Sequence, residues 1–216
     1  MNGISMECAS RRHVLRCALA LWGSGAVQNV LGQNNGDAHT RADHCEHMAI
    51  AAKAPIKRSE TSYRLPVVPM LDQHGRKVVF SEALDDGRPV IMNFVFTSCT
   101  TVCPVMTQIF AEVQARLGAA VGRVHMVSVS IDPQYDTPAR LLAYARDHGA
   151  GAQWDFYTGS SDASMAVQKA FDAYRGDKMN HAPLTMLRAA NSSNWVRLDG
   201  FVGADEIVSA YRAIVV

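Results

Sequence analysis

This sequence lacks features that would point to several classes of partner or fold. Its formal net charge is only +1, from 21 basic and 20 acidic side chains in 216 residues, so no polybasic face is indicated for nucleic acid or an anionic membrane surface. No internal repeat is present, and low complexity is confined to the polar stretch GQNNGDAHTRADHCEH. The composition, 48% hydrophobic and 19% charged, is typical of one globular domain with a terminal extension.

The sequence also lacks an apolar run of the length that an ordinary membrane span needs, about 20 residues. Residues 17–27 are uncharged but form a shorter stretch, and they follow the paired Arg11 and Arg12. This order of a basic region, an apolar region and small residues is typical of a signal peptide. The sequence from Ser10 also resembles the twin-arginine export pattern, although Val14 stands where that pattern prefers Phe.

The export segment determines the predicted domain organisation. We predict an export signal or a retained N-terminal anchor over residues 1–38, with cleavage after Ala26 or after Ala38. Residues 39–62 lack hydrophobic periodicity and are predicted to form a flexible tether, and residues 63–216 are predicted to form the folded domain. The domain is therefore expected to be exported, either periplasmic or attached to the outer face of the inner membrane.

Cysteine is scarce, with five in the whole chain. Cys8 and Cys17 fall inside the predicted export segment, which leaves Cys45, Cys99 and Cys103. An odd number of cysteines in an oxidising compartment leaves one thiol that pairs elsewhere, stays free or holds a metal.

Hydrophobic patterns predict an α/β fold with a mixed central sheet and helices on both faces. Two short strands flank a turn at residues 72–75, and a hairpin and a helix close the chain. Continuous apolar runs predict buried strands at residues 89–96 and 123–131, with a short strand at 154–159; helices are predicted from Pro104 to Gly118, after the cap Thr137, over 162–174 and over 204–215. A CxxxC motif after the first buried strand makes the thioredoxin-like fold the simplest choice.

The two cysteines of this motif, Cys99 and Cys103, lie in FTSCTTVCPVM, between a predicted strand and a predicted helix. A helix N-terminus stabilises a thiolate through its dipole and unpaired N–H groups. The spacing also allows the two Cα atoms to be close enough for a disulfide, and two thiolates with an open third position suit Cu(I). A static disulfide, a redox dithiol and a soft-metal site therefore all fit the pair.

Three stretches together resemble the SCO/SenC family of thioredoxin-like copper-binding proteins, which help to assemble the copper sites of cytochrome oxidase. They are FTSCTTVCP, the segment SVSIDPQYDTP at residues 128–138, and the lone His181 before a late strand. The resemblance extends from about Leu65 to the end of the chain. It implies that Cys99, Cys103 and His181 bind Cu(I) or Cu(II), and two thiolates with one imidazole are a donor set that suits copper.

The resemblance also implies a function as a metallochaperone, an assembly factor that delivers copper to the copper subunit of a cytochrome oxidase or to another copper carrier. The alternative is a thiol–disulfide oxidoreductase that uses Cys99 and Cys103 to reduce the cysteines of a copper-site partner. Pro183 favours this alternative, because a proline before this strand in thioredoxin-like oxidoreductases is often cis and packs against the redox cysteines. His181 separates the two functions, since disulfide exchange needs only the dithiol. A peroxidase is disfavoured because FTSC lacks the proline of the PxxxT/SxxC motif.

Two aspartates in DPQYDTP have two interpretations. Asp132 and Asp136 follow the second buried strand, so they are expected at the same sheet edge as Cys99. There they would tune the copper site or dock the protein that receives copper. They also fit a local role, shaping the turn before a helix that Thr137 caps.

A second group of metal-binding side chains lies in the predicted tether, at His44, Cys45, His47 and Met48 in the sequence HCEHM. All four are donors for copper, so this stretch would capture copper and pass it to the domain. Cys45 would alternatively resolve a mixed disulfide, and such residues also occur in a tether without any function.

Overall fold

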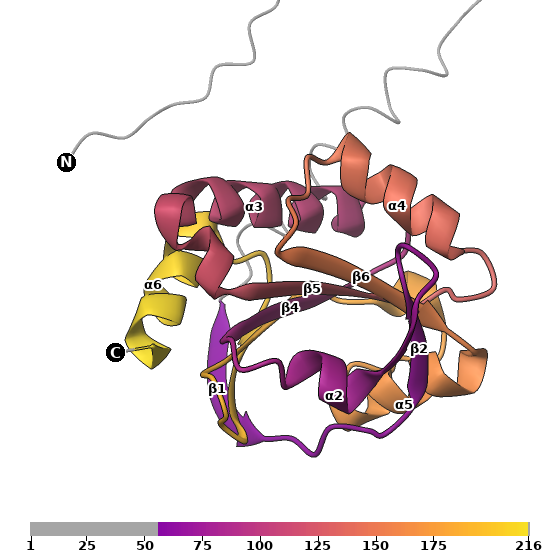
Figure 1. Ribbon diagram of the computed structural model, residues 1–216, viewed down its shortest axis with the longest axis horizontal. Coiled ribbons are helices and arrows are strands. Elements are labelled where there is room, and N and C mark those ends of the chain that lie inside the picture. The colour runs from indigo at the N-terminus through magenta and orange to yellow at the C-terminus, as the bar shows by residue number, and fades with distance from the viewer. Residues whose placement is uncertain (1–55, 216) are drawn as a thin grey trace, which may run out of the picture.

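Eight strands form one mixed sheet in the part of the chain that the computed structural model describes, residues 56–215 (Figure 1). Their order across the sheet is β1-β8-β7-β4-β5-β6-β2-β3. Neighbouring β4, β5 and β6 are parallel, and the other neighbouring pairs are antiparallel. The strands are β1 (Lys57–Ser62), β2 (Pro69–Asp72), β3 (Lys77–Val79), β4 (Val90–Val95), β5 (His125–Ser130), β6 (Trp154–Gly159), β7 (Leu184–Arg188) and β8 (Asn194–Asp199).

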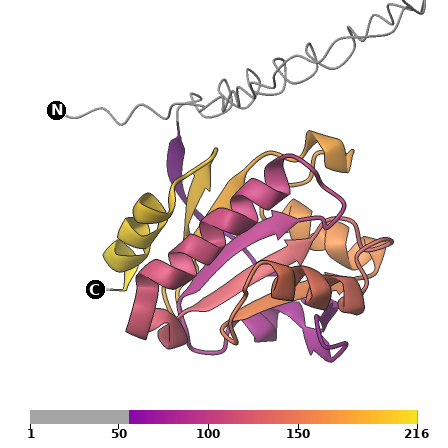
Figure 2. The same cartoon turned by 90° about the horizontal axis from the view of Figure 1, so that it is seen from above.

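Helices cover both faces of this sheet, as predicted. One core lies under α3, α4 and α6, and the other lies under α2 and α5. Figure 2 shows α3 lying across the central strands with α6 beside it. The helices are α2 (Phe80–Leu84), α3 (Val102–Leu117), α4 (Pro138–Asp147), α5 (Ser161–Ala170) and α6 (Ala204–Ile214), with short 3-10 helices η1 (Gly118–Arg123) and η2 (Lys178–Asn180). The predicted α/β, thioredoxin-like architecture is therefore confirmed.

The central strands form because they are apolar on both faces. Every residue of β4 is buried, and alternate side chains enter opposite cores: Ile91 packs under α3, whereas Met92 packs under α5. Burying each such side chain contributes roughly 1.5–3 kcal/mol. This burial fixes the register of β4, and with it the position of the loop that carries the two cysteines.

Helix α3 begins two residues earlier than predicted, at Val102 instead of Pro104. A proline is tolerated in the first helical turn because the first backbone N–H groups have no acceptor within the helix. Cys103 therefore lies inside the helix, where its side chain is buried. Helix α5 ends at Ala170, before the predicted end at residue 174.

The tether predicted over residues 39–62 is wrong at its C-terminal end. Lys57–Ser62 form strand β1, which pairs along its whole length with β8. The sequence KRSETS has no apolar side chain, so hydrophobic periodicity gives no sign of the strand, and backbone pairing with β8 supplies it instead. The other predictions for residues 1–55, including those for Cys8, Cys17 and Cys45, lie outside the described residues.

The antiparallel strands bring the start of β1 to the same sheet edge as the end of β4. Lys57 is opposite Asp199 on β8, and Asp199 is opposite Leu184 at the start of β7. Asn93, near the end of β4, is opposite Thr185, the next residue along β7. No helix within the described range is long and apolar enough to cross a membrane.

Candidate functional site

The two cysteines of the CxxxC motif lie together at the carboxyl end of β4. Cys99 is half-buried in the loop after the strand, and Cys103 is 1% exposed in the first turn of α3. The backbone N–H of Cys103 points at the Sγ atom of Cys99, 3.4 Å away. The side chain of Thr101 lies 3.7 Å from the same sulfur. Both thiols are free, so the loop presents a reduced dithiol.

The two thiols differ in acidity. Burial raises the pKa of Cys99, but hydrogen bonds to its sulfur from Cys103 and Thr101 outweigh burial, and the pKa is lowered overall. Burial raises the pKa of Cys103, and the negative charges of Cys99 and Asp136 raise it further. Cys99 is therefore the thiol that ionises first, and Cys103 keeps its proton until a metal or an oxidant removes it.

Asp136 connects the DPQYDTP turn to the cysteine loop. Its carboxylate is fully buried and accepts hydrogen bonds from the backbone N–H of Thr97 at 3.2 Å, from the hydroxyl of Thr97, and from the hydroxyl of Ser130 at 2.6 Å. Thr97 lies two residues before Cys99. The local role also holds, because Thr137 accepts a hydrogen bond from Arg140 N as the cap of α4.

His181 lies on the loop between η2 and β7, where it is half-buried. Its Nε2 atom is 3.2 Å from the carbonyl oxygen of Phe94 on β4. A carbonyl only accepts hydrogen bonds, so Nε2 carries the proton and Nδ1 keeps its lone pair. Burial lowers the pKa of His181, which favours the neutral ring. Histidines that bind metals usually donate their second ring N–H in this way.

The structure brings Cys99 and Cys103 into contact but does not bring His181 into the same cluster. Within residues 56–215, no group of three or more His, Cys, Asp or Glu side chains is close enough to hold a metal ion. The histidine is nevertheless attached to β4, the strand that leads into the cysteine loop. A three-ligand site at this edge would therefore require the loops to move together.

A cavity of about 310 Å³ lies beside His181, between the loop that precedes β7 and the end of β5. Its wall includes Lys178 and Asp132, which form an ion pair between the His181 loop and the DPQYDTP turn. The Lys178 ammonium also lies 5.5 Å from the centre of the Phe96 ring. Sequence reasoning missed Lys178, because nothing in the local sequence indicates a partner 46 residues away.

Exposed apolar side chains lie on these same loops. Met179 is 69% exposed, Tyr135 is 44% exposed, and Tyr174 is 36% exposed on the cavity wall. Tyrosine, methionine and arginine are enriched where proteins contact one another. The loops around this cavity therefore have the composition of a contact surface.

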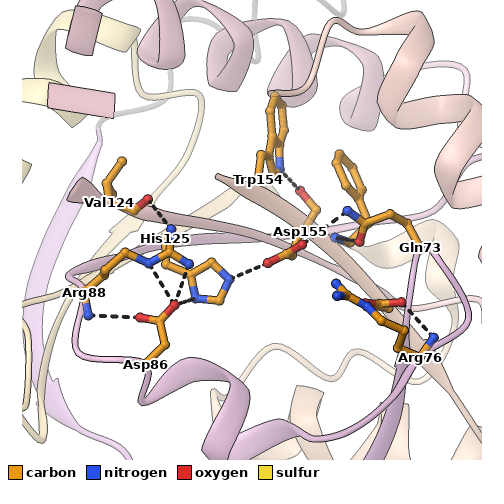
Figure 3. Close-up of polar contacts among 11 residues, drawn as sticks. Gln73, Arg76, Asp86, Arg88, Val124, His125, Trp154 and Asp155 are labelled. Carbon is orange, nitrogen blue, oxygen red and sulfur yellow. Dashed lines mark hydrogen bonds and ion pairs between the residues drawn. The ribbon is translucent and has the colours of Figure 1, made fainter. Parts of the chain in front are cut away.

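A second polar cluster, at the opposite edge of the sheet, is structural (Figure 3). His125, the first residue of β5, is 1% exposed and lies between two carboxylates. Its Nε2 atom is 3.0 Å from Asp155, and its Nδ1 atom is 3.4 Å from Asp86, beyond good hydrogen-bond geometry. Arg88 donates to Asp86 in turn. These contacts connect β5 to β6 and to the loop that carries Asp86 and Arg88, and the imidazole between them is closed off from solvent.

Comparisons with known proteins agree with the two motifs. The family model described as SCO1/SenC matches residues 68–214. A protein of Bacillus subtilis (strain 168), described as a SCO1 protein homolog, is 32% identical over 105 residues. That alignment covers 48% of this chain and 53% of the relative, so the chain spans about half the length of the relative that it matches.

Solved structures agree with the fold. One is BsSco, described as a member of the Sco family of cytochrome c oxidase assembly proteins with a disulfide switch; it is 27% identical, with a TM-score of 0.61 over 72% of this chain and 95% of its own. Another is Arabidopsis thaliana ScoI with copper bound, 21% identical, with a TM-score of 0.55 over 66% of this chain and 91% of its own. At that identity the second likeness supports the fold alone.

Proposed function

Because the chain belongs to the SCO1/SenC family, we propose that it binds copper through Cys99, Cys103 and His181 and delivers it to a cytochrome oxidase copper site. The single observation that carries this proposal is the reduced dithiol at the carboxyl end of β4, with a neutral histidine attached to the same strand. The likeness to BsSco supports it, since that protein belongs to the Sco family of cytochrome c oxidase assembly proteins.

The chemistry of the three side chains fits a copper cargo. Two thiolate sulfurs and one imidazole nitrogen are soft or borderline donors, which Cu(I) prefers and Cu(II) accepts. Cys99 loses its proton more readily, so it makes the first bond, and Cys103 gives up its proton only when the metal is present. His181 would donate through Nδ1 while Nε2 stays on the Phe94 carbonyl.

Copper binding then requires the His181 loop to approach the dithiol. The Lys178–Asp132 ion pair holds this loop to the DPQYDTP turn, with Lys178 39% exposed and Asp132 13% exposed. Because solvent reaches the ammonium group, we assign the pair a small contribution, about 1 kcal/mol. The loop is therefore restrained by a contact that is easily exchanged. A receiving protein that docks on the rim formed by Tyr135, Tyr174 and Met179 would meet both the loop and the turn.

The place of action is part of the same proposal. The basic and apolar segments within residues 1–38 support export of the domain, and an oxidase copper site on the outer side of the membrane would be reached from the periplasm. The domain proper would then begin at β1, at Lys57, in place of residue 63.

Copper titration tests the ligand set. The reduced protein would be titrated with Cu(I) against a competing chelator, beside His181→Ala and the matched control His74→Ala, which changes an exposed histidine on a turn. We expect His181→Ala to weaken Cu(I) binding by about 100-fold or more, since even a residue that only supports a ligand contributes 10–100-fold. Equal affinity in the two variants would remove His181 from the site.

Thiol–disulfide exchange is the second candidate function, and the asymmetry of the dithiol favours it. A thiol with a lowered pKa attacks a disulfide, and a buried partner then resolves the mixed disulfide. Pro183 lies before β7 as predicted, but its peptide bond is trans, like every other in residues 56–215. His181→Ala separates the two functions, because it should leave reduction of a small disulfide unchanged. Reduction that fell together with copper affinity would contradict this separation.

A further inference from the structure

The turn that carries His181 is held together by its own hydrogen bonds. In residues 177–181, named here the histidine turn, the N–H of His181 donates to the carbonyl of Lys178 at 3.1 Å, and the N–H of Asn180 donates to the carbonyl of Asp177 at 3.0 Å. Lys178 and His181 are three residues apart, in η2 and directly after it, so their side chains lie on the same side of the turn. Both side chains line the cavity. The two side chains are therefore expected to move together.

One side chain of the histidine turn contacts both of the other segments of the site. The Lys178 ammonium pairs with the Asp132 carboxylate of the DPQYDTP turn at 2.5 Å, and it lies 5.5 Å from the centre of the Phe96 ring. Phe96 precedes the cysteine loop, is 3% exposed and packs in one cluster with Cys103. Lys178 therefore connects the histidine turn to the DPQYDTP turn and to the start of the cysteine loop.

The carboxylate that holds Lys178 belongs to a fixed part of the fold. The carbonyl of Asp132 accepts a hydrogen bond from the N–H of Asp136 at 2.8 Å. The Asp136 side chain is fully buried and accepts from the backbone N–H of Thr97 in the cysteine loop. By contrast, residues 174–180 are all exposed. The histidine turn is therefore the side of the ion pair that moves more easily.

The ion pair opposes the movement that copper binding needs. Within residues 56–215, no three metal-binding side chains form a cluster, so His181 must shift toward the dithiol before it can share a copper ion with it. The cavity of about 310 Å³ beside the histidine turn leaves room for a shift, and the imidazole can pivot on the carbonyl of Phe94. Because Asp132 stays in place while Lys178 moves with His181, the shift separates the ammonium from its carboxylate.

From this geometry we infer that Lys178 is a positioning residue that opposes copper loading, because its ion pair with Asp132 and the bond from His181 to copper exclude each other. The inference rests on the proposed function for the identity of the copper site. A contact that exists only in the copper-free protein reduces the fraction of chains that are ready to bind, and it weakens the apparent affinity by that fraction. The contribution of a weak ion pair corresponds to about fivefold in the dissociation constant. The pair therefore favours release of copper to a recipient.

The test measures the affinity of the reduced whole chain for Cu(I) against a competing chelator, without oxygen. Every protein, including the parent, carries Cys8→Ser, Cys17→Ser and Cys45→Ser, so that the dithiol supplies the only thiols. Two variants each remove one side of the ion pair, Lys178→Met and Asp132→Asn. A third variant carries both changes.

Lys169→Met is the matched control. It removes an ammonium group from α5 that lies 5.3 Å from the centre of the Tyr174 ring, on the wall of the same cavity. Among the ion pairs of residues 56–215, none involves Lys169. The control therefore changes the charge near the site in the same way as Lys178→Met but leaves the Lys178–Asp132 pair intact.

We expect Lys178→Met and Asp132→Asn each to bind Cu(I) about fivefold more tightly than the parent, and Lys169→Met to bind like the parent. The double variant should bind no more tightly than either single variant, because both changes remove the same contact. Asp132→Asn is the decisive variant. Loss of a negative charge by itself weakens the binding of a cation, whereas loss of the ion pair strengthens it. Unchanged or weaker binding by Asp132→Asn would overturn the inference.

His181→Ala separates this inference from the proposed function. In a His181→Ala background, Lys178→Met should no longer tighten Cu(I) binding, because no imidazole has to move; equal tightening in both backgrounds would mean that Lys178 acts on the fold alone and would overturn the inference. If His181→Ala binds Cu(I) as tightly as the parent, the proposed ligand set is wrong. If His181→Ala binds more weakly but the ion-pair variants match the parent, only the role of Lys178 is wrong.

Discussion

Asp136→Asn is the substitution that most directly tests how the fold positions the dithiol. The carboxylate is fully buried and accepts from the backbone and hydroxyl of Thr97 and from the hydroxyl of Ser130. Asparagine has almost the same shape, but its amide nitrogen donates and cannot accept. One oxygen can still serve Thr97, and the hydroxyl of Ser130 can turn to accept, so the main loss is of charge-assisted bonding.

The magnitude follows from these contacts. Hydrogen bonds to charged groups contribute about 1.5–3 kcal/mol each, against about 0.5–1.5 kcal/mol for neutral ones. Weakening two or three such bonds in a buried position should lower the free energy of unfolding by about 2–3 kcal/mol. The substitution also removes a negative charge that raises the pKa of Cys103, so that thiol should be alkylated at a lower pH than in the parent protein.

The assay is urea denaturation of the reduced protein at neutral pH, with Asp132→Asn as the matched control. Asp132 lies in the same turn, but its carboxylate pairs with the exposed Lys178, so its loss should cost at most about 1 kcal/mol. A double-mutant cycle with Thr97→Val should give a coupling energy of about 1 kcal/mol or more. Equal destabilisation by Asp136→Asn and Asp132→Asn, with no coupling to Thr97, would refute the reasoning.

Two further predictions concern titration. Burial raises the pKa values of Asp155 and Asp86, but hydrogen bonds from His125 to Asp155 and from Arg88 to Asp86 outweigh burial and lower both pKa values overall. The two carboxylates therefore stabilise the folded protein above the pKa of an unfolded carboxyl group, near 4. This stabilisation is lost as the pH falls through the pKa values of the folded state. Thermal melts from pH 7 to pH 3 should show a smaller loss for Asp155→Asn than for the parent, and parallel curves would contradict this. Cys99 should be alkylated well before Cys103 at neutral pH, because its pKa is lowered and it is more exposed; mass spectrometry of a time course checks the order, and equal rates would contradict it.

The sheet was predictable where burial leaves a pattern in the sequence. The apolar run before the CxxxC motif became β4, with every residue buried, and the Thr137–Pro138 signal became the cap and first residue of α4. Strand β1 was missed because its side chains are polar and mostly exposed, so only its backbone pairing reveals it. A strand that forms only because its backbone pairs with another strand leaves no hydrophobic pattern in its own sequence.

The same distinction applies to the candidate site. The motif identifies Cys99 and Cys103 because these two residues are close together in the sequence. His181 is far from them in the sequence, and only the family resemblance indicates it. What Asp136 does for the cysteine loop was not predictable in detail, since Thr97 lies 39 residues away from it. The contact of His181 with Phe94 spans 87 residues. Such contacts depend on which distant segments of the chain lie side by side in the fold, and hydrophobic periodicity and capping signals do not encode this.

Strand β1 also has a consequence for how the protein behaves among other chains. Without Lys57–Ser62, β8 would be the outermost strand, and its unpaired N–H and C=O groups would form an open template beside the buried Trp195 and Leu198. A charged, exposed strand makes a poor template for further pairing. Strand β1 therefore hinders edge-to-edge pairing between copies of the chain. We expect a chain shortened to begin at residue 63 to be less soluble while its two cysteines keep their arrangement.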